Sequence, residues 1–168
     1  LTPLRQHMHA DEHEQYTICS LYCDTPDWQL IRTSQEKPYY KEKLRVRSYG
    51  TPAQDAEVFA EIKKKCEGVV YKRRIGMNYQ QAVDYLDGAP APEESQISRE
   101  IDWFCRFYEG LQPAMCIFYD RLAVFDREQP DLRVTFDSGI RWRMDDLDLS
   151  CGSDGAHLLP HDTCLMEI

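Results

Sequence analysis

The sequence predicts an α+β fold of antiparallel strands with helices packed on the outside, and closure of the strands into a β-barrel would enclose a tunnel. Three observations point to it. Segments of strand length in which polar and apolar residues alternate recur along most of the 168-residue chain, as in half-buried antiparallel strands. Two further segments instead show helical spacing of apolar residues. Basic residues recur at alternate positions of several expected strands, so closure of the sheet would place a set of cations inside.

The expected strands are short and are separated by turn-forming residues. They span Tyr16–Cys23, Tyr39–Tyr49, Val58–Lys65, Val69–Ile75, Ala114–Phe125, Leu132–Phe136 and Thr163–Ile168.

Two helices are expected between these strands. Asn78 and Gln81 form a capping pair that would open a short helix ending at Leu86. Apolar residues between Ile97 and Tyr108 then follow helical spacing. The segment 87–92 (DGAPAP) separates the two patterns and predicts a linker, because glycine and proline interrupt helices. We expect both helices to pack on the outer face of the sheet.

Composition predicts a single globular domain over residues 1–168, since 42% of the residues are hydrophobic. The net charge of −9 argues against a nucleic-acid-binding protein, which is usually basic. Positive charge is nevertheless concentrated: residues 37–74 contain 11 Lys and Arg against 5 Asp and Glu, and the rest of the chain contains 9 against 24. A basic interior within an acidic shell would admit a narrow anion and repel duplex DNA.

The seven cysteines lack the spacing of a zinc site or a redox motif, and we expect them to be reduced and mostly buried. The sequence contains no signal peptide, no membrane-spanning apolar stretch and no lipidation motif. These observations predict a cytoplasmic domain without a membrane segment.

The segment 41–47 (KEKLRVR) carries the clearest functional signal. In an extended strand Lys41, Lys43, Arg45 and Arg47 share one face. Neighbours about 6.6 Å apart would repel by roughly 2.5 kcal/mol at an effective dielectric of ~20. We therefore expect water, carboxylates or an anionic ligand to complete this face. An ordinary solvated edge strand is the alternative interpretation.

Several segments resemble, in their residues and in their order, the VTC domain, which is the polyphosphate polymerase domain of the vacuolar transporter chaperone complex and its bacterial relatives. That domain belongs to the triphosphate tunnel metalloenzyme superfamily, whose fold is described as CYTH-like. The resemblance therefore implies an antiparallel β-barrel (tunnel) with helices packed outside. The segments are 16–26 (YTICSLYCDTP), 41–50 (KEKLRVRSYG), 58–65 (VFAEIKKK), 69–74 (VVYKRR), 118–121 (FYDR), 132–137 (LRVTFD) and 165–168 (LMEI).

The resemblance implies an enzyme that transfers the terminal phosphate of ATP to a growing polyphosphate chain inside a basic tunnel, with Mn or Mg as cofactor. It also implies ATP and polyphosphate or triphosphate as ligands, with a membrane protein as a candidate partner. Matched position by position, the catalytic cations would be Arg45, Arg47, Lys63, Lys72, Arg121 and Arg133. Lys43, Arg74 and Tyr119 would bind substrate, and Glu167 would bind the metal.

Two other functions fit the same residues. One is hydrolysis of triphosphate or nucleoside triphosphates, and the other is non-catalytic binding of polyphosphate. The resemblance implies that the family's first strand would precede Leu1 and that its C-terminal segment would follow Ile168, so we expect part of the tunnel to be missing from this chain.

The remaining polar clusters are weaker candidates. His7, His9 and His13 lie in an acidic stretch that we expect to be a mobile, solvent-exposed N-terminal segment. The acidic run at 145–148 (DDLD) is typical of a solvated turn or a helix start rather than a cation site.

Overall fold

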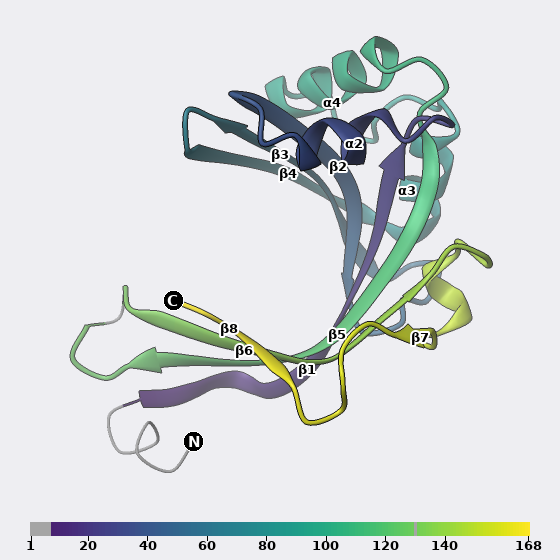
Figure 1. Cartoon of the computed structure of the whole chain (residues 1–168). Coiled ribbons are helices and arrows are strands. Elements are labelled where there is room, and N and C mark those ends of the chain that lie inside the picture. The colour runs from purple at the N-terminus through teal and green to yellow at the C-terminus, as the bar shows by residue number, and fades with distance from the viewer. Residues whose placement is uncertain (1–7, 130) are drawn as a thin grey trace.

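The computed structural model describes residues 8–129 and 131–168. Eight strands form one sheet in the order β4-β3-β2-β1-β5-β6-β7, and β8 also pairs with β6. The strands are β1 Met8–Asp24, β2 Tyr40–Tyr49, β3 Glu57–Cys66, β4 Val69–Asn78, β5 Gln112–Asp126, β6 Arg133–Arg143, β7 Ala156–His157 and β8 Cys164–Glu167. Every recorded pairing is antiparallel, and the sheet curves strongly around an open interior (Figure 1).

The predicted α+β class is confirmed, but the predicted closure into a barrel is not seen. Within residues 8–129 and 131–168, β4 forms one edge of the sheet and no pairing joins it to β7 or β8. Most residues of β4 are exposed. The described sheet is therefore an open, curved wall with a concave and a convex face.

Two strands extend well beyond their predicted ends. β1 begins at Met8, so His9 and His13 lie in a strand rather than in a mobile segment, while His7 falls outside the described residues. β6 continues past Phe136 to Arg143. Its pairing with β5 shifts register between Phe118 and Asp120, and Gly139 in β6 has a left-handed φ of 57°. A bulge therefore carries the strand through residues that, by composition, resemble a turn.

The α-helices of the described chain are α2 (Gln29–Gln35), α3 (Tyr79–Leu86) and α4 (Gln96–Phe107). Asn78 and Gln81 form the predicted capping box at the start of α3. Helix α2 was not predicted. A short 3-10 helix (Leu149–Cys151) follows Asp148, whose carboxylate accepts a hydrogen bond from the Ser150 amide. The acidic run therefore starts a helical turn, as expected.

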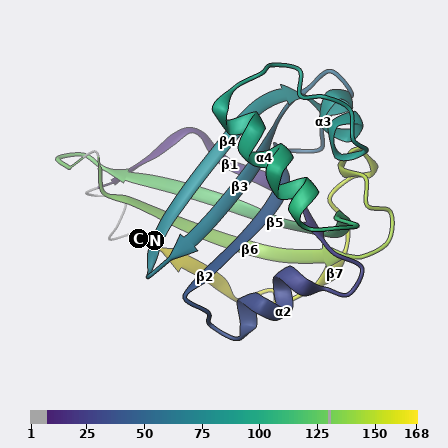
Figure 2. The same cartoon turned by 90° about the horizontal axis from the view of Figure 1, so that it is seen from above.

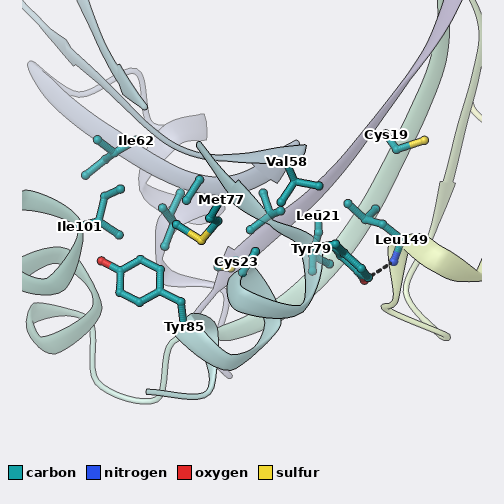
Figure 3. Packing of buried hydrophobic residues seen from close by; sticks show 14 of the residues in the cluster. Cys19, Leu21, Cys23, Val58, Ile62, Met77, Tyr79, Tyr85, Ile101 and Leu149 are labelled. Atoms are coloured by element: carbon teal, nitrogen blue, oxygen red, sulfur yellow. Dashed lines mark hydrogen bonds between the residues drawn. The ribbon is translucent and has the colours of Figure 1, made fainter. Parts of the chain in front are cut away.

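The main core lies between the convex face and helices α3 and α4 (Figure 2). Leu44, Val46 and Ile62 from the sheet and Ile101 and Phe104 from α4 are almost fully buried. Figure 3 shows this layer, including the Leu149 amide, which donates a 2.8 Å hydrogen bond to the Tyr79 hydroxyl. Helices α3 and α4 thus cover the convex face of the sheet.

All seven cysteine thiols are free, and three of them are buried. Across the described residues, no helix is both long enough and apolar enough to span a bilayer.

Candidate functional site

The concave face of the sheet is basic because its residues alternate with those of the core. On β2, Leu44 and Val46 point toward the helices, so Lys43, Arg45 and Arg47 point the opposite way. The same alternation holds along the neighbouring strands. We define the basic face by the predicted cations that it gathers: Lys43, Arg45 and Arg47 of β2, Lys63 of β3, Lys72 and Arg74 of β4, Arg121 of β5 and Arg133 of β6.

Strand register brings these cations side by side. Lys43 lies opposite Lys63 on β3, and Lys63 lies opposite Lys72 on β4. The last register is set by the two-residue turn Glu67-Gly68, in which both residues have a positive φ (49° and 85°), as a type I′ hairpin requires. Three lysines therefore follow one another across three strands, and the pKa of Lys63 is lowered by burial and by the charges of Lys43 and Arg45.

A buried carboxylate, Glu61, lies at the centre of the basic face and is 1% exposed. Its Oε2 atom is 2.7 Å from Arg45 Nη2 and 3.9 Å from Arg47 Nε, and its Oε1 atom is 2.9 Å from Lys72 Nζ. Burial alone would raise the pKa of Glu61, but Lys72, Arg45 and Arg47 together lower it. One carboxylate thus offsets part of the repulsion expected from the sequence.

Two tyrosines extend the arginine pair. Arg45 Nη1 donates a 2.7 Å hydrogen bond to the Tyr22 hydroxyl, and Arg47 Nη2 donates a 3.1 Å bond to the Tyr119 hydroxyl. Lys43 Nζ lies 5.4 Å from the centre of the Tyr22 ring. Burial would raise the pKa of Tyr22, yet the neighbouring Arg45 and Lys43 charges lower it overall. These phenols hold the guanidinium groups in fixed orientations.

Two buried donors beside each other are left without a protein acceptor. Arg47 has a side chain only 8% exposed, and its Nε atom has no hydrogen-bond partner among the described residues. The same is true of the hydroxyl of Ser20, which lies opposite Arg47 on β1. Because buried donors are normally satisfied, this pair requires an oxygen acceptor from outside the protein, such as a bound water or an anion.

A second ionic group lies around Arg121. Its Nε and Nη2 atoms donate to the two carboxylate oxygens of Asp137 at 2.6 and 2.7 Å. Arg121 Nη2 is also 3.7 Å from Oε2 of Glu167, whose side chain is 74% exposed. The Asp137 hydrogen bonds are the largest cause of the raised pKa of Arg121. Asp137 thus orients Arg121, whereas Glu167 stays open to solvent.

The structure brings most, but not all, of the predicted residues into contact. Arg45, Arg47 and Lys72 surround Glu61, while Lys43 and Lys63 adjoin them. Tyr119 links this group to Arg121, because Tyr119 accepts from Arg47 and its ring lies 5.1 Å from the Arg121 guanidinium carbon. Arg74 and Arg133 instead lie over the rings of Phe59 (4.5 Å) and Phe125 (5.3 Å).

Sequence reasoning did not assign site roles to Tyr22, Glu61 or Asp137. Alternation along the strands would have placed both carboxylates on the concave face. Glu61 lies two residues before Lys63, and Asp137 lies two residues after Thr135. The ion-pair partners of these carboxylates could not be predicted from the sequence, because the pairing of Arg121 with Asp137 depends on the register of β5 against β6.

No group of three or more His, Cys, Asp or Glu side chains suited to a metal ion occurs among the described residues. Glu61 and Asp137 are already engaged by cations. The side chain of Glu167, by contrast, is 74% exposed, and together with substrate phosphates it would supply one of the one or two carboxylates with which Mg²⁺ is commonly bound.

No curated protein matches the chain. The profile of the VTC domain family, in contrast, matches residues 1–168, the full length of the sequence. The order of the basic strands and the complete match together identify this chain as a member of the VTC domain family.

Proposed function

We propose that this protein transfers the terminal phosphate of ATP to a polyphosphate chain lying along the basic face, with Mn or Mg as cofactor. The observation that carries the proposal is the pair of unsatisfied buried donors, Arg47 Nε and the hydroxyl of Ser20, which lies opposite Arg47 on the neighbouring strand. Family membership supports a polyphosphate-related function. Closure of the face into a tunnel, a cytoplasmic location and a membrane-protein partner stay predictions.

The proposed reaction needs positioning and charge neutralisation rather than a covalent protein nucleophile. A terminal oxygen of polyphosphate attacks the γ-phosphorus of ATP, the bond from that phosphorus to the bridging oxygen breaks, and ADP leaves. Arg45 and Arg47 would hold the equatorial oxygens with forked hydrogen bonds. Lys63 and Lys72 would add point charge as negative charge moves toward the leaving oxygen.

Arg121 and Glu167 would work at the neighbouring part of the face. Asp137 fixes the Arg121 guanidinium, which would contact a phosphate in a constant orientation. Glu167, with phosphate oxygens, would hold the divalent ion, which when bound neutralises phosphate charge. Arg133, Lys43, Arg74 and Tyr119 would guide the chain to either side.

Non-catalytic polyphosphate binding is a second candidate. It is favoured by the single open carboxylate, since Glu167 alone supplies few of the oxygen ligands that a divalent ion requires.

Incubation of the purified protein with ATP and MnCl2 tests the proposal. We expect polyphosphate to lengthen, as seen on a gel, with one ADP formed for each phosphate added. Release of free phosphate without chain growth would show that the protein is a hydrolase rather than a polymerase. Binding of polyphosphate with neither product would favour the second candidate.

The metal role of Glu167 gives a separate prediction. Glu167→Gln should raise the Mn concentration needed for half-maximal activity by about tenfold or more, because the open carboxylate is lost. Its thermal stability should change little, since the side chain is largely exposed. An unchanged Mn requirement in Glu167→Gln would remove this residue from the metal site.

A further inference from the structure

A pocket is formed where helix α2 and the α4 region meet the start of β2. Its volume is about 440 Å³. We call it the aromatic pocket. It is lined by Gln29, Leu30 and Thr33 of α2, Tyr40, Lys41 and Glu42 of β2, and Trp103, Phe107 and Tyr108, the last following α4.

Four aromatic side chains form much of its wall. The rings of Trp103 and Phe107 are stacked, with centres 4.7 Å apart and planes inclined by 18°. Phe107 also meets Tyr108 edge to face, with centres 5.0 Å apart. Trp103 is 52% exposed, Phe107 58% and Tyr40 42%. So many large rings in contact and open to solvent are unusual for residues that only fill a core.

A buried carboxylate forms the floor of the aromatic pocket. Glu42 is 6% exposed, and its Oε2 and Oε1 atoms accept hydrogen bonds from the hydroxyls of Tyr40 (2.7 Å) and Tyr108 (2.9 Å). Burial, followed by Glu42, raises the pKa of both tyrosines, so both remain neutral donors near pH 7. The carboxylate is hydrogen-bonded, but these bonds do not neutralise its charge.

Neither of the two neighbouring lysines, Lys64 and Lys41, forms a close ion pair with the Glu42 carboxylate. Lys64 Nζ is 4.0 Å from Glu42 Oε2 and 3.8 Å from Glu100 Oε2, beyond hydrogen-bond distance from either. Lys41, which also lines the pocket, directs its ammonium to the carbonyl and hydroxyl oxygens of Ser34, at 3.2 and 3.0 Å. A cation entering the pocket would therefore find both a carboxylate and aromatic faces.

We infer that the aromatic pocket binds a small alkylated ammonium ion, with its charge toward Glu42 and its methyl groups against Trp103, Phe107 and the tyrosines. Aromatic faces attract weakly hydrated quaternary ammonium groups, and the attraction strengthens where water is excluded. The pocket is large enough for such a group and a short chain. Glu42 alternates with Lys43 of the basic face, so its carboxylate lies on the opposite side of the sheet, and the inferred ammonium binding does not depend on the proposed phosphate chemistry.

Calorimetric titration of the whole chain with choline tests the inference, with 3,3-dimethylbutan-1-ol as the neutral analogue of equal shape. We expect saturable choline binding at a dissociation constant on the order of 1 mM or tighter, and at least about tenfold weaker binding of the alcohol. Equal binding of the two compounds, or no saturable binding of choline, would overturn the assignment.

Two variants locate the site. Trp103→Ala removes a ring from the exposed wall. Glu42→Gln removes the charge and keeps one carbonyl oxygen that can accept from one of the two phenols. Each variant should weaken choline binding about tenfold. Tyr71→Ala is the matched control, because Tyr71 is equally exposed (53%) but lies on β4 outside the pocket. If Tyr71→Ala weakened binding as much as Trp103→Ala does, the binding would be nonspecific and the inference wrong. Thermal melts of each variant identify any loss caused by unfolding.

Discussion

Arg45 shows how a single residue can serve both the fold and the ligand. Its guanidinium contacts the buried carboxylate of Glu61 and the hydroxyl of Tyr22. Arg45→Ala should lower triphosphate affinity about ten- to hundredfold, because a charge-assisted forked contact is lost. The substitution should also lower the melting temperature of the ligand-free protein, because the buried carboxylate of Glu61 loses a close ion-pair partner. Calorimetric titration and thermal melts measure the two effects.

Arg99 is the matched control for Arg45. It forms an exposed ion pair with Glu94, with side chains 61% and 84% exposed, and exposed pairs contribute little. Equal triphosphate affinities of Arg45→Ala and Arg99→Ala would remove the basic face from the proposed site.

The buried carboxylate of Glu61 predicts a pH effect with a definite sign. Its pKa is lower in the folded protein than the ordinary value of 4.5, so its ionised form stabilises the fold at neutral pH and that stabilisation is lost as pH falls below about 4.5. Glu61→Gln should unfold more easily than the wild type by about 3–5 kcal/mol at pH 7. The difference should shrink on acidification from about pH 5 toward the folded pKa.

Urea unfolding of both proteins across this pH range measures the effect of Glu61. The exposed substitution Glu94→Gln should give a small difference at every pH. A Glu61→Gln difference that stayed constant down to pH 3 would show that packing, rather than ionisation, accounts for the loss.

At the scale of elements, the first turn of helix α2 depends on a residue that precedes the helix, because the N-cap residue Trp28 makes no side-chain cap. Asp24, at the end of β1, accepts hydrogen bonds from the Leu30 and Ile31 amides at 2.9 and 3.1 Å. Asp24→Ala should destabilise the fold by about 1–2 kcal/mol, because buried amides lose their acceptor. Asp27→Ala, which removes an exposed partner of Arg32, should cost less in the same thermal melt. Equal losses would mean that Asp24 does not cap the helix.

This dependence also explains which elements the sequence could predict. Helix α3 carries its capping box locally, in Asn78 and Gln81, and the strands around the basic face alternate clearly. Helix α2 has no such signal: Trp28, at its N-cap, is left-handed with a φ of 62° and caps nothing with its side chain. Its seven residues bury only Leu30, so no helical periodicity was visible.

At the scale of the whole molecule, the sequence predicted which strand positions share the basic face but not how the sheet ends. Alternation along a strand is a local property, whereas the meeting of two sheet edges depends on curvature and on which strand lies beside which. The same limit applies to the aromatic pocket. Its residues lie on α2, β2 and the α4 region, which are far apart in sequence. No single sequence motif unites these residues into a predicted binding site.

Ligand binding should stabilise the molecule as a whole. A triphosphate that binds only the folded protein should raise the melting temperature by roughly 5–10 °C at about 100 times its dissociation constant. Added NaCl should reduce the shift, because screening weakens the attraction. Sulfate at matched ionic strength should have a much smaller effect. If micromolar sulfate matched triphosphate, the basic face would be a nonspecific cationic surface.

The placement of a basic face within a chain of net charge −9 has a consequence for the speed of ligand capture. At an ionic strength of about 0.01 M, charges are felt over roughly 30 Å, so an approaching anion first meets the repulsion of the whole protein. At about 0.1 M that range falls to roughly 10 Å, and the nearby lysines and arginines dominate the final approach. The association rate of a short polyphosphate should therefore pass through a maximum as salt rises, unlike the steady decline typical of a protein whose surface is basic throughout.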